Sequence, residues 1–478
     1  MKPRVLIRTD GNSRIGLGHL VRCTALAQML KNYFDISFYC LSIPELLVNE
    51  ANERDFKIVI ISNENEFFDI ITSDKIVVLD GYDFNSDYQK IIKNKGAKLV
   101  CIDDLHNREF VADLIINQTP GITPGDYKAL AYTQFALGLN YVLLRPAFLE
   151  QLKNDRRIDK VETIFICFGG ADPKGLTIKT VRTVAGFNKF KKIIVVTGAA
   201  FNITYEFDLL LLSYPQINHR HNLNETQMLD AMLEAELAIV PASVILLETL
   251  SAGCMVISGV MVENQKNLYA NFLKTGLIID AGSFSEDELI KAISDVLVMP
   301  IKNNKAVFGK SYENVLRLFN RLKDELIINI REVTADDLNV TFDWASDSKI
   351  RKFSFQRHII SFSEHVEWFS KKISDPHCLY LIAEFGERRV GSIRFDQINE
   401  EAVISYLLNP EFHGNGFGQI ILKLGIEMLV SKNLNKKEVV KHISGEVMKT
   451  NIPSIKSFER LGFIKNDLGN KYKFDKYL

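Results

Sequence analysis

At 478 residues the chain is too long for one ordinary hydrophobic core, and roughly 150 residues per domain predicts about three lobes. Hydrophobic residues make up 47% of the sequence and charged residues 24%, and the formal net charge of −1 gives no reason to expect nucleic acid or an acidic membrane surface as a partner. No run of about 18 apolar residues predicts a membrane span, and the start "MKPRVLIRTD" lacks the apolar stretch of a secretory signal, so a cytoplasmic location is expected.

The six cysteines show neither CxxC nor CxxH spacing, and several lie in apolar runs such as "IFICFGG". This pattern predicts reduced thiols packed in the core, without a structural zinc site and with no other metal expected. The six are Cys23, Cys40, Cys101, Cys167, Cys254 and Cys378.

Residues 1–150 alternate short β-rich runs, such as "RVLIR", "FDISFYC" and "KIVVLDGYD", with helical patterns, of which His19–Leu30 is the clearest. A second alternating series, residues 151–325, starts at "TIFICFGGADPKG" and ends in a helical pattern near Ser311–Glu325. The order predicts an α/β fold of two doubly wound, Rossmann-like lobes joined near Arg145–Asp159. In such sheets ligands bind beyond the carboxyl ends of the strands, so we expect a site between the lobes.

Residues 328–478 have a different character. "LYLIAEFGERRVGSIRFDQ" predicts a hairpin, "EAVISYLL" a further strand, and "KYKFDKYL" a strand at the end. A helix should follow "HGNGFG" and turn Ile420, Ile421, Leu424 and Met428 inward. We therefore expect a separate domain of mixed α+β structure with antiparallel pairing.

The stretch "RIGLGHLVR" places a histidine where a glycine turn opens into a helix. Gly16 and Gly18 would leave backbone N–H groups free at the helix start, which attracts anions and disfavours a protonated imidazole at His19. A neutral imidazole suits a general base, and Arg22 could contact a phosphate. The alternatives are that His19 only packs or caps the helix and that Arg22 is solvated.

Carboxylates and a second glycine turn follow other strands. Asp10, Asp80 and Asp103 sit at strand ends, where they could orient sugar hydroxyls or His19, or act as helix caps or turn residues. In the second lobe the glycine turn of "FGGADPKG", Gly169 and Gly170, could meet phosphate oxygens.

The stretch "PASVILLETLSAGC" predicts a helix opened by Ser243 and Val244, with Glu248 one turn further in. The serine hydroxyl and the backbone amides would bind a diphosphate, and the carboxylate of Glu248 would bind a ribose diol. Taken singly, Ser243 is typical of a helix cap and Glu248 of a solvated helix residue. Asn264 and Gln265 return toward the same site.

Residues 1 to about 320 resemble the UDP-sugar hydrolases of pseudaminic acid biosynthesis, relatives of the two-lobed GT-B glycosyltransferases. The stretches that carry the resemblance are "IRTDGNSRIGLGHLVRCTALA", "VVLDGYDF", "CIDDLHNREFVADLIINQ", "LGLNYVLLRPAF" and "FICFGGADPKG", together with the Ser243 segment. The resemblance implies hydrolysis of UDP-2,4-diacetamido-2,4,6-trideoxy-β-L-altropyranose. It also implies that His19 activates water, that Tyr82 lies near it, and that the second lobe, with Ser243 and Glu248, binds UDP.

In the third domain "HGNGFG" follows a strand and precedes a helix, so its backbone amides would suit a pyrophosphate. This loop is similar to the Q/R-x-x-G-x-G/A loop of the GNAT acetyltransferases, with His413 in the Gln/Arg position. The resemblance implies acetyl-CoA as cosubstrate and a cofactor-binding loop made of His413, Gly414, Asn415, Gly416, Phe417 and Gly418.

"KTNIPSIKSFERLGFIK" resembles the ending of the same family, which implies that Asn451 contacts the pantetheine arm of the cofactor. The tyrosine that often protonates the leaving thiolate is replaced by Phe458, so that proton donor is unassigned. Glu446 or Tyr406 could help to deprotonate the amine through water.

Together the two resemblances predict a bifunctional enzyme that acetylates the 4-amino group of a UDP-amino sugar and then hydrolyses the product. Three alternatives stay open: a glycosyltransferase with an acceptor other than water, the equivalent enzyme for another nonulosonate precursor such as that of legionaminic acid, and a nucleotide-sugar sensor without turnover. The expected partners are the UDP-amino sugar and acetyl-CoA, without nucleic acid or membrane, and the sequence leaves the oligomeric state undetermined.

Overall fold

A computed structural model of the chain describes residues 2–12, 17–154, 156–299, 308–356, 358–414, 416–433 and 439–478. It divides into two compact units, Met1–Lys128 with Phe135–Phe319 and Ala129–Gln134 with Asn320–Leu478. None of the described helices has the length and apolar character needed to cross a lipid bilayer. The expected domain boundaries at residues 150, 325 and 328 stay predictions.

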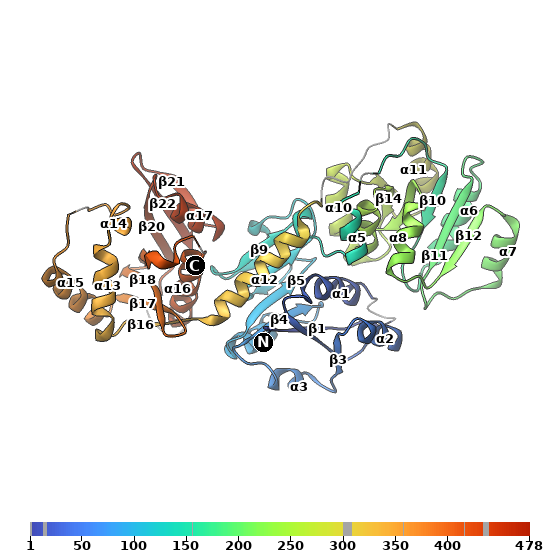
Figure 1. The fold of residues 1–478 in the computed structure, drawn as a ribbon. Helices are drawn as coiled ribbons and strands as arrows, with labels where there is room; N and C mark the ends of the chain where they lie inside the picture. Colours follow the sequence, from blue (N-terminus) through green and yellow to red (C-terminus); the bar gives the residue numbers. More distant parts are fainter. Residues whose placement is uncertain are drawn as a thin grey trace. The chain divides into compact units, whose positions relative to one another are not determined.

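The first lobe contains a seven-stranded sheet in the order β3-β2-β1-β4-β5-β7-β9 (Figure 1). Its pairs from β3 to β7 are all parallel. The strands are β1 Arg4–Thr9, β2 Asp35–Cys40, β3 Lys57–Ile60, β4 Lys75–Asp80, β5 Lys98–Ile102, β7 Leu114–Asn117 and β9 Gln134–Leu137, and β6 Glu109–Phe110 pairs separately with β8 Lys128–Ala129. The helices are α1 Gly18–Leu30, α2 Glu45–Glu53, α3 Glu64–Asp69 and α4 Ser86–Asn94.

The second lobe contains a six-stranded parallel sheet in the order β12-β11-β10-β13-β14-β15. Successive residues of β10 alternate between two hydrophobic clusters, Phe165 in one and Ile164 and Ile166 in the other. Both faces of the sheet are therefore buried under helices, as a parallel sheet requires. The strands are β10 Thr163–Ile166, β11 Lys192–Thr197, β12 Ile217–His221, β13 Leu237–Pro241, β14 Met255–Gly259 and β15 Ile279–Asp280. The helices are α5 Pro146–Gln151, α6 Leu176–Ala185, α7 Tyr205–Ser213, α8 Glu225–Leu233, α9 Val244–Ser251, α10 Lys266–Thr275 and α11 Glu286–Val298.

The second unit contains a seven-stranded mixed sheet in the order β16-β17-β18-β19-β20-β22-β21. The expected hairpin is present as β17 and β18, and the helix expected after "HGNGFG" is α16. The strands are β16 Ile328–Glu332, β17 Cys378–Phe385, β18 Arg388–Ile398, β19 Glu401–Leu408, β20 His442–Met448, β21 Ile464–Asp467 and β22 Lys471–Tyr477. The helices are α13 Leu338–Ser346, α14 Ser348–Arg351, α15 Phe362–Ser374, α16 Phe417–Asn433 and α17 Ile452–Arg460, and α12 Ser311–Ile327 runs directly into β16.

The pair β19 and β20 is the one parallel pair of this sheet. Their register covers only Glu401–Ile404 against His442–Gly445, although both strands continue for several residues. The carboxyl ends of β19 and β20 therefore separate, and each presents backbone and side chains that the neighbouring strand does not cover. The expected inward face of α16 packs against this sheet through Ile420, Ile421 and Leu424.

The fold class expected from the sequence, two doubly wound α/β lobes followed by a mixed α+β domain, is confirmed by these three sheets. The six cysteines are all free thiols, and five of them are buried.

Candidate functional site

The strand order of the first lobe changes direction beside β1. The chain builds outward from β1 through β2 and β3 on one side and through β4, β5 and β7 on the other. At such a point the loops after the two central strands diverge and leave room for a ligand. His19, in the first turn of α1, and Asp80, the last residue of β4, both lie here.

His19 and Asp80 form a buried pair. The Nδ1 atom of His19 lies 2.6 Å from Oδ1 of Asp80, and the two residues are 7% and 0% exposed. The ring of Tyr82 stands edge-on to the imidazole with centroids 4.8 Å apart, as the family resemblance implied. His19 is therefore surrounded by polar groups rather than by an apolar core.

Arg22 has a different environment from the one expected. It is 5% exposed, so the interpretation of this side chain as solvated is wrong. Its Nε donates to Oδ2 of Asp80 at 2.6 Å, its second terminal nitrogen to Oδ1 at 2.6 Å, and its first to both oxygens of Asp104 at 2.7 Å. This guanidinium is therefore held by two carboxylates, and its contact with a phosphate stays a prediction.

These contacts set the charges of the site. Burial alone would raise the pKa of Asp80, but the charge of Arg22 and the hydrogen bonds from Arg22 and His19 outweigh it and hold that pKa far below its usual range, so the carboxylate stays ionised. Burial, reinforced by the charge of Asp104, raises the pKa of Tyr82 to about 12 and keeps its hydroxyl protonated.

The other carboxylates predicted at strand ends are bound within the lobe. Asp10 accepts from the backbone of Leu41 and Ser42 at 2.6 and 3.0 Å and pairs with Arg8 at 2.7 Å. Asp103 accepts from the backbone of Leu105 and His106, which is the turn role considered above.

Of the two glycines before His19, Gly16 lies outside the described residues and Gly18 opens α1. A Cβ built on Gly18 would meet nothing within 4 Å, so there is open space beside this first helical residue.

The second lobe changes direction in the same way beside β10, whose neighbours are β11 and β13. Gly169 follows β10 with φ of +83°, a conformation that favours glycine. A Cβ on Gly198, after β11, would come within 2.5 Å of the Gly170 backbone, so these two loops approach as closely as glycine allows. Ser243 precedes α9, which begins at Val244, and its hydroxyl does not cap the helix. The Ser243 hydroxyl and the first amides of α9 thus lie at this edge, where a diphosphate is expected.

Glu248 is 3% exposed, so its interpretation as a solvated helix residue is wrong. It accepts two hydrogen bonds from Arg145, at 2.7 Å from Nε and 2.9 Å from a terminal nitrogen. No sequence signal marked Arg145 as this partner, although it stands in the stretch "YVLLRPAF" that carries the family resemblance. A role for Glu248 toward a ribose stays a prediction.

Two asparagines of the second lobe reach residues of the first. Nδ2 of Asn264 donates to the hydroxyl of Tyr82 at 2.9 Å, and Nδ2 of Asn267 donates to the backbone carbonyl of Asp104 at 3.0 Å. Gln265 instead accepts from the backbone of its own loop, at Met261. The expected return of this segment toward the site therefore holds through Asn264, and Asn267 is a contact that no sequence signal marked.

In the second unit the loop before α16 has the geometry of an anion cradle. Gly414 and Gly416 have φ of +83° and +82°, and a Cβ on either would meet nothing within 4 Å. This open space beside backbone amides at a helix start fits the pyrophosphate of acetyl-CoA. Phe417 and Gly418 form the first turn of α16, while Asn415 lies outside the described residues. His413 is turned back, and its Nε2 lies 3.1 Å from the carbonyl of Leu408.

The separated ends of β19 and β20 carry the remaining candidates. Oδ1 of Asn451 caps α17 by accepting from the backbone N–H of Ser454 at 3.2 Å, and the hydroxyl of Tyr406 donates to Ser454 Oγ at 2.9 Å. Phe458 is 2% exposed and stacks on Phe474 with ring centroids 4.9 Å apart, so it belongs to the core. Glu446 is exposed and pairs with Lys471 at 2.5 Å.

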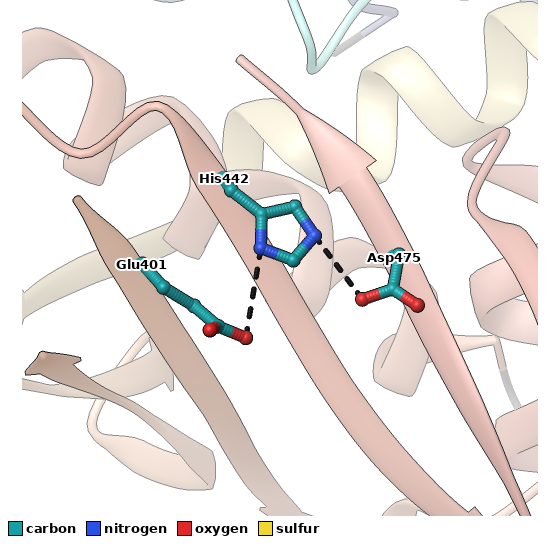
Figure 2. A group of neighbouring side chains, drawn as sticks. All are labelled: Glu401, His442 and Asp475. Atoms are coloured by element: carbon teal, nitrogen blue, oxygen red, sulfur yellow. Dashed lines mark ion pairs between the residues drawn. The ribbon is translucent and has the colours of Figure 1, made fainter.

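One group of three side chains in the described ranges has its ligand atoms within 4.8 Å of one another, close enough to hold a metal ion. Figure 2 shows His442 on β20 between Glu401 on β19 and Asp475 on β22, at 3.5 Å from Nδ1 and 3.1 Å from Nε2. The ammonium of Lys473 lies 3.5 Å and 3.2 Å from the same two carboxylates. This ammonium balances their charge and would repel a divalent ion, so the group does not define a metal site.

The fold and these loops define two doubly wound α/β lobes followed by a mixed α+β domain with an open glycine loop before α16. Residues 328–464 match the acetyltransferase (GNAT) domain family. Acetyl-CoA is thus the cosubstrate that the domain family and the glycine cradle support.

Three relatives extend this picture. The chain is 26% identical over 487 residues to an uncharacterized protein of Methanocaldococcus jannaschii, covering 98% of both. It is 31% identical over 183 residues to the UDP-2,4-diacetamido-2,4,6-trideoxy-beta-L-altropyranose hydrolase of Campylobacter jejuni, covering 37% of this chain and 64% of the hydrolase. It is 27% identical over 293 residues to the spore coat polysaccharide biosynthesis protein SpsG of Bacillus subtilis, covering 58% of this chain and 83% of that protein. The chain thus joins a part similar to this hydrolase to a GNAT domain.

Proposed function

We propose that the chain performs two consecutive steps of pseudaminic acid biosynthesis. In this proposal residues 328–478 transfer an acetyl group from acetyl-CoA to the 4-amino group of UDP-4-amino-4,6-dideoxy-N-acetyl-β-L-altrosamine. Residues 1–325 then hydrolyse the resulting UDP-2,4-diacetamido-2,4,6-trideoxy-β-L-altropyranose to UDP and free sugar. A cytoplasmic location is part of the proposal.

The observation that carries the hydrolytic half is the pairing of His19 with an ionised carboxylate at the switch point of the first sheet. In the proposed step, Nε2 of His19 accepts a proton from water as the water oxygen bonds to the anomeric carbon. The bond between that carbon and the diphosphate oxygen breaks, and UDP leaves with the electron pair. A base in this position contributes roughly 10²–10⁴-fold to the rate.

Residues around the imidazole and in the second lobe would hold the substrate. Tyr82, fixed by Asn264, presents a protonated hydroxyl beside the imidazole. The amides of Gly169 and Gly170 and the start of α9 at Ser243 and Val244 would bind the diphosphate, since unpaired N–H groups stabilise the negative charge of the leaving group.

The acetyl-transfer half rests on the GNAT match and on the cradle at Gly414 and Gly416. Acetyl-CoA supplies an activated acyl group that an amine attacks directly, so no enzyme nucleophile is required. The loop amides would hold the pyrophosphate, Asn451 would contact the pantetheine arm, and Glu446 could remove the proton of the amine through water.

The test is to incubate the whole chain with the synthetic UDP-4-amino sugar and acetyl-CoA and to analyse the products by mass spectrometry. The proposal expects both CoA and UDP, with a free diacetamido sugar. A His19→Asn variant should still release CoA but accumulate the acetylated UDP-sugar, whereas a Gly416→Ala variant should release CoA more slowly at subsaturating acetyl-CoA and retain hydrolysis of the pre-acetylated substrate. CoA release without UDP release in the wild-type chain would contradict the hydrolytic half.

The similarity to SpsG over more than half of the chain favours one alternative, a related sugar nucleotide in place of the altropyranose. The rates of UDP release from epimeric UDP-diacetamido sugars decide between the altropyranose and such a related sugar. UDP release that requires an added acceptor sugar would instead indicate a glycosyltransferase.

A further inference from the structure

The carboxylate of Asp80 is the centre of a buried network that reaches the proposed base. We propose that Asp80 is a positioning residue that fixes the tautomer of His19, and that Arg22 and Asp104 hold Asp80 in place for this task. The inference deepens the proposed function and rests on its assignment of His19 as the base. None of these four side chains is drawn from the second lobe, so the device belongs to the first lobe alone.

Of the four hydrogen bonds that described side chains make to the Asp80 carboxylate, three come from His19 and Arg22. Oδ1 accepts from His19 and from Arg22, both at 2.6 Å, and Oδ2 accepts from Arg22 at 2.6 Å and from the thiol of Cys23 at 3.4 Å. The side chain of Asp80 is fully buried, so an ionised carboxylate here is stable only with a paired cation. Arg22 is that cation, bound side-on through two nitrogens, which fixes the plane of the carboxylate.

The fixed carboxylate decides which imidazole nitrogen carries the proton. The carboxylate is the nearer neighbour of Nδ1, at 2.6 Å against 3.1 Å for the Arg22 nitrogen that itself donates to Oδ1 of Asp80. An ionised carboxylate only accepts hydrogen bonds, so the 2.6 Å contact requires a proton on Nδ1. In the neutral ring the lone pair is then on Nε2, to which no described residue is hydrogen-bonded. A general base needs an unprotonated nitrogen that faces water, and this tautomer provides it.

Arg22 joins this pair to a second carboxylate. Its terminal nitrogen contacts both oxygens of Asp104 at 2.7 Å, so Asp80 and Asp104 hold the guanidinium from two sides. The backbone carbonyl of Asp104 accepts in turn from Asn267 of the second lobe at 3.0 Å. The guanidinium cannot turn away from Asp80 without breaking the Asp104 contacts. Asp80 is therefore held in one orientation, and it holds the imidazole of His19 in turn.

A purely structural role would also explain a buried ion pair, so the test must read the imidazole itself. In the whole chain labelled with ¹⁵N-histidine, a His19→Gln variant identifies the signals of His19. At alkaline pH the proposal expects a protonated Nδ1 and an unprotonated Nε2 in the wild-type chain. The opposite tautomer in the wild-type chain would overturn the proposal, and this measurement needs neither a variant at Asp80 nor any substrate.

The Asp80→Asn variant provides the kinetic test, because its amide can donate to Nδ1 and so shift the ring proton to Nε2. We expect kcat for UDP release to fall roughly 10²–10⁴-fold with KM changed less than about threefold. The matched control is Asp113→Asn, which removes another fully buried carboxylate of the same lobe, paired with Lys93 at 2.7 Å. It should leave kcat per folded molecule and the His19 tautomer unchanged.

The outcomes separate the two proposals. An Asp80→Asn chain with unchanged kcat and tautomer overturns the positioning role while hydrolysis stands. A wild-type chain that shows the expected tautomer but releases no UDP from the diacetamido sugar contradicts the hydrolytic function and leaves the Asp80 network intact.

Discussion

Tyr406 is one of two polar residues of β19, with Ser405, that lie past the end of its pairing with β20. Its hydroxyl donates to Ser454 at 2.9 Å, and burial raises its pKa, so it stays protonated at neutral pH. A protonated hydroxyl at the separated strand ends can donate to the departing thiolate, the role that the buried Phe458 cannot fill. This assignment also differs from a role as base, since a hydroxyl that is still protonated at neutral pH has no oxyanion with which to take the proton of the amine.

A Tyr406→Phe variant should lower kcat for acetyl transfer roughly 10²-fold and leave UDP release from the acetylated substrate unchanged. The measurement is CoA release at saturating acetyl-CoA. The matched control is Tyr380→Phe, another buried tyrosine whose pKa burial raises, on β17 of the same sheet. Equal losses in the two variants would indicate a packing effect and remove Tyr406 from the mechanism.

At the residue scale, the sequence could place candidates at the site but could not name their partners. His19 and Tyr82 follow from local stretches that resemble a family, and they do lie together. Arg22 pairs with residues 58 and 82 positions away, and Glu248 with one 103 positions away. Pairing at such separations depends on the folded sheet, so both residues could be expected to face solvent when only their own helices were considered.

At the element scale, periodicity was sufficient for strands and helices but not for every pairing. Alternating apolar runs predicted the two parallel sheets, and the expected inward face of α16 is correct at Ile420, Ile421 and Leu424. The expectation of antiparallel pairing in the third domain is correct for β17, β18 and β19 and misses the parallel pair of β19 and β20. The two strands are parallel because α16 returns the chain to the amino-terminal end of β19 before β20 begins. This return depends on how α16 packs on the sheet, and no local sequence pattern predicts it.

The glycine loop before α16 permits a test of an element rather than of a single contact. Gly416→Ala forces a side chain into a conformation with φ of +82° beside the expected pyrophosphate. We expect the KM for acetyl-CoA to rise roughly tenfold or more, because the strain moves amides that must point at the ligand.

Gly469 supplies the control for this loop. It has φ of +84° and open space around it, and it lies in the turn between β21 and β22. Gly469→Ala carries the same backbone strain, so a comparable rise in KM would show that strain alone, and not the loop, weakens binding. UDP release from acetylated substrate should be unchanged in both variants.

At the scale of the whole chain, the acetyltransferase unit is not a simple continuous segment. It includes Ala129–Gln134 from the first third of the sequence, and Ala131 and Tyr132 pack in its hydrophobic core. It also includes the end of α12, where Glu325 receives a hydrogen bond of 2.6 Å from Lys423 of α16. The sequence predicted a boundary at residue 328 because the composition changes there. Composition alone gives no sign of the buried ion pair between Glu325 and Lys423, which lie on opposite sides of that boundary.

The pair of Lys423 and Glu325 makes the position of this boundary measurable. Both side chains are fully buried, so removing Glu325 takes away a carboxylate that pairs with an ammonium in the core, at a cost of about 3–5 kcal/mol. We expect a chain that begins at residue 328 to unfold at a lower temperature than one that begins at residue 320. Both chains lack residues 129–134, so the absence of that segment does not contribute to the difference. Lys423→Met should recover most of the difference in the shorter chain, because methionine fills a similar volume without a charge. Equal melting temperatures for the two lengths, or a Lys423→Met variant that recovers nothing, would show that the boundary at 328 is the physical one.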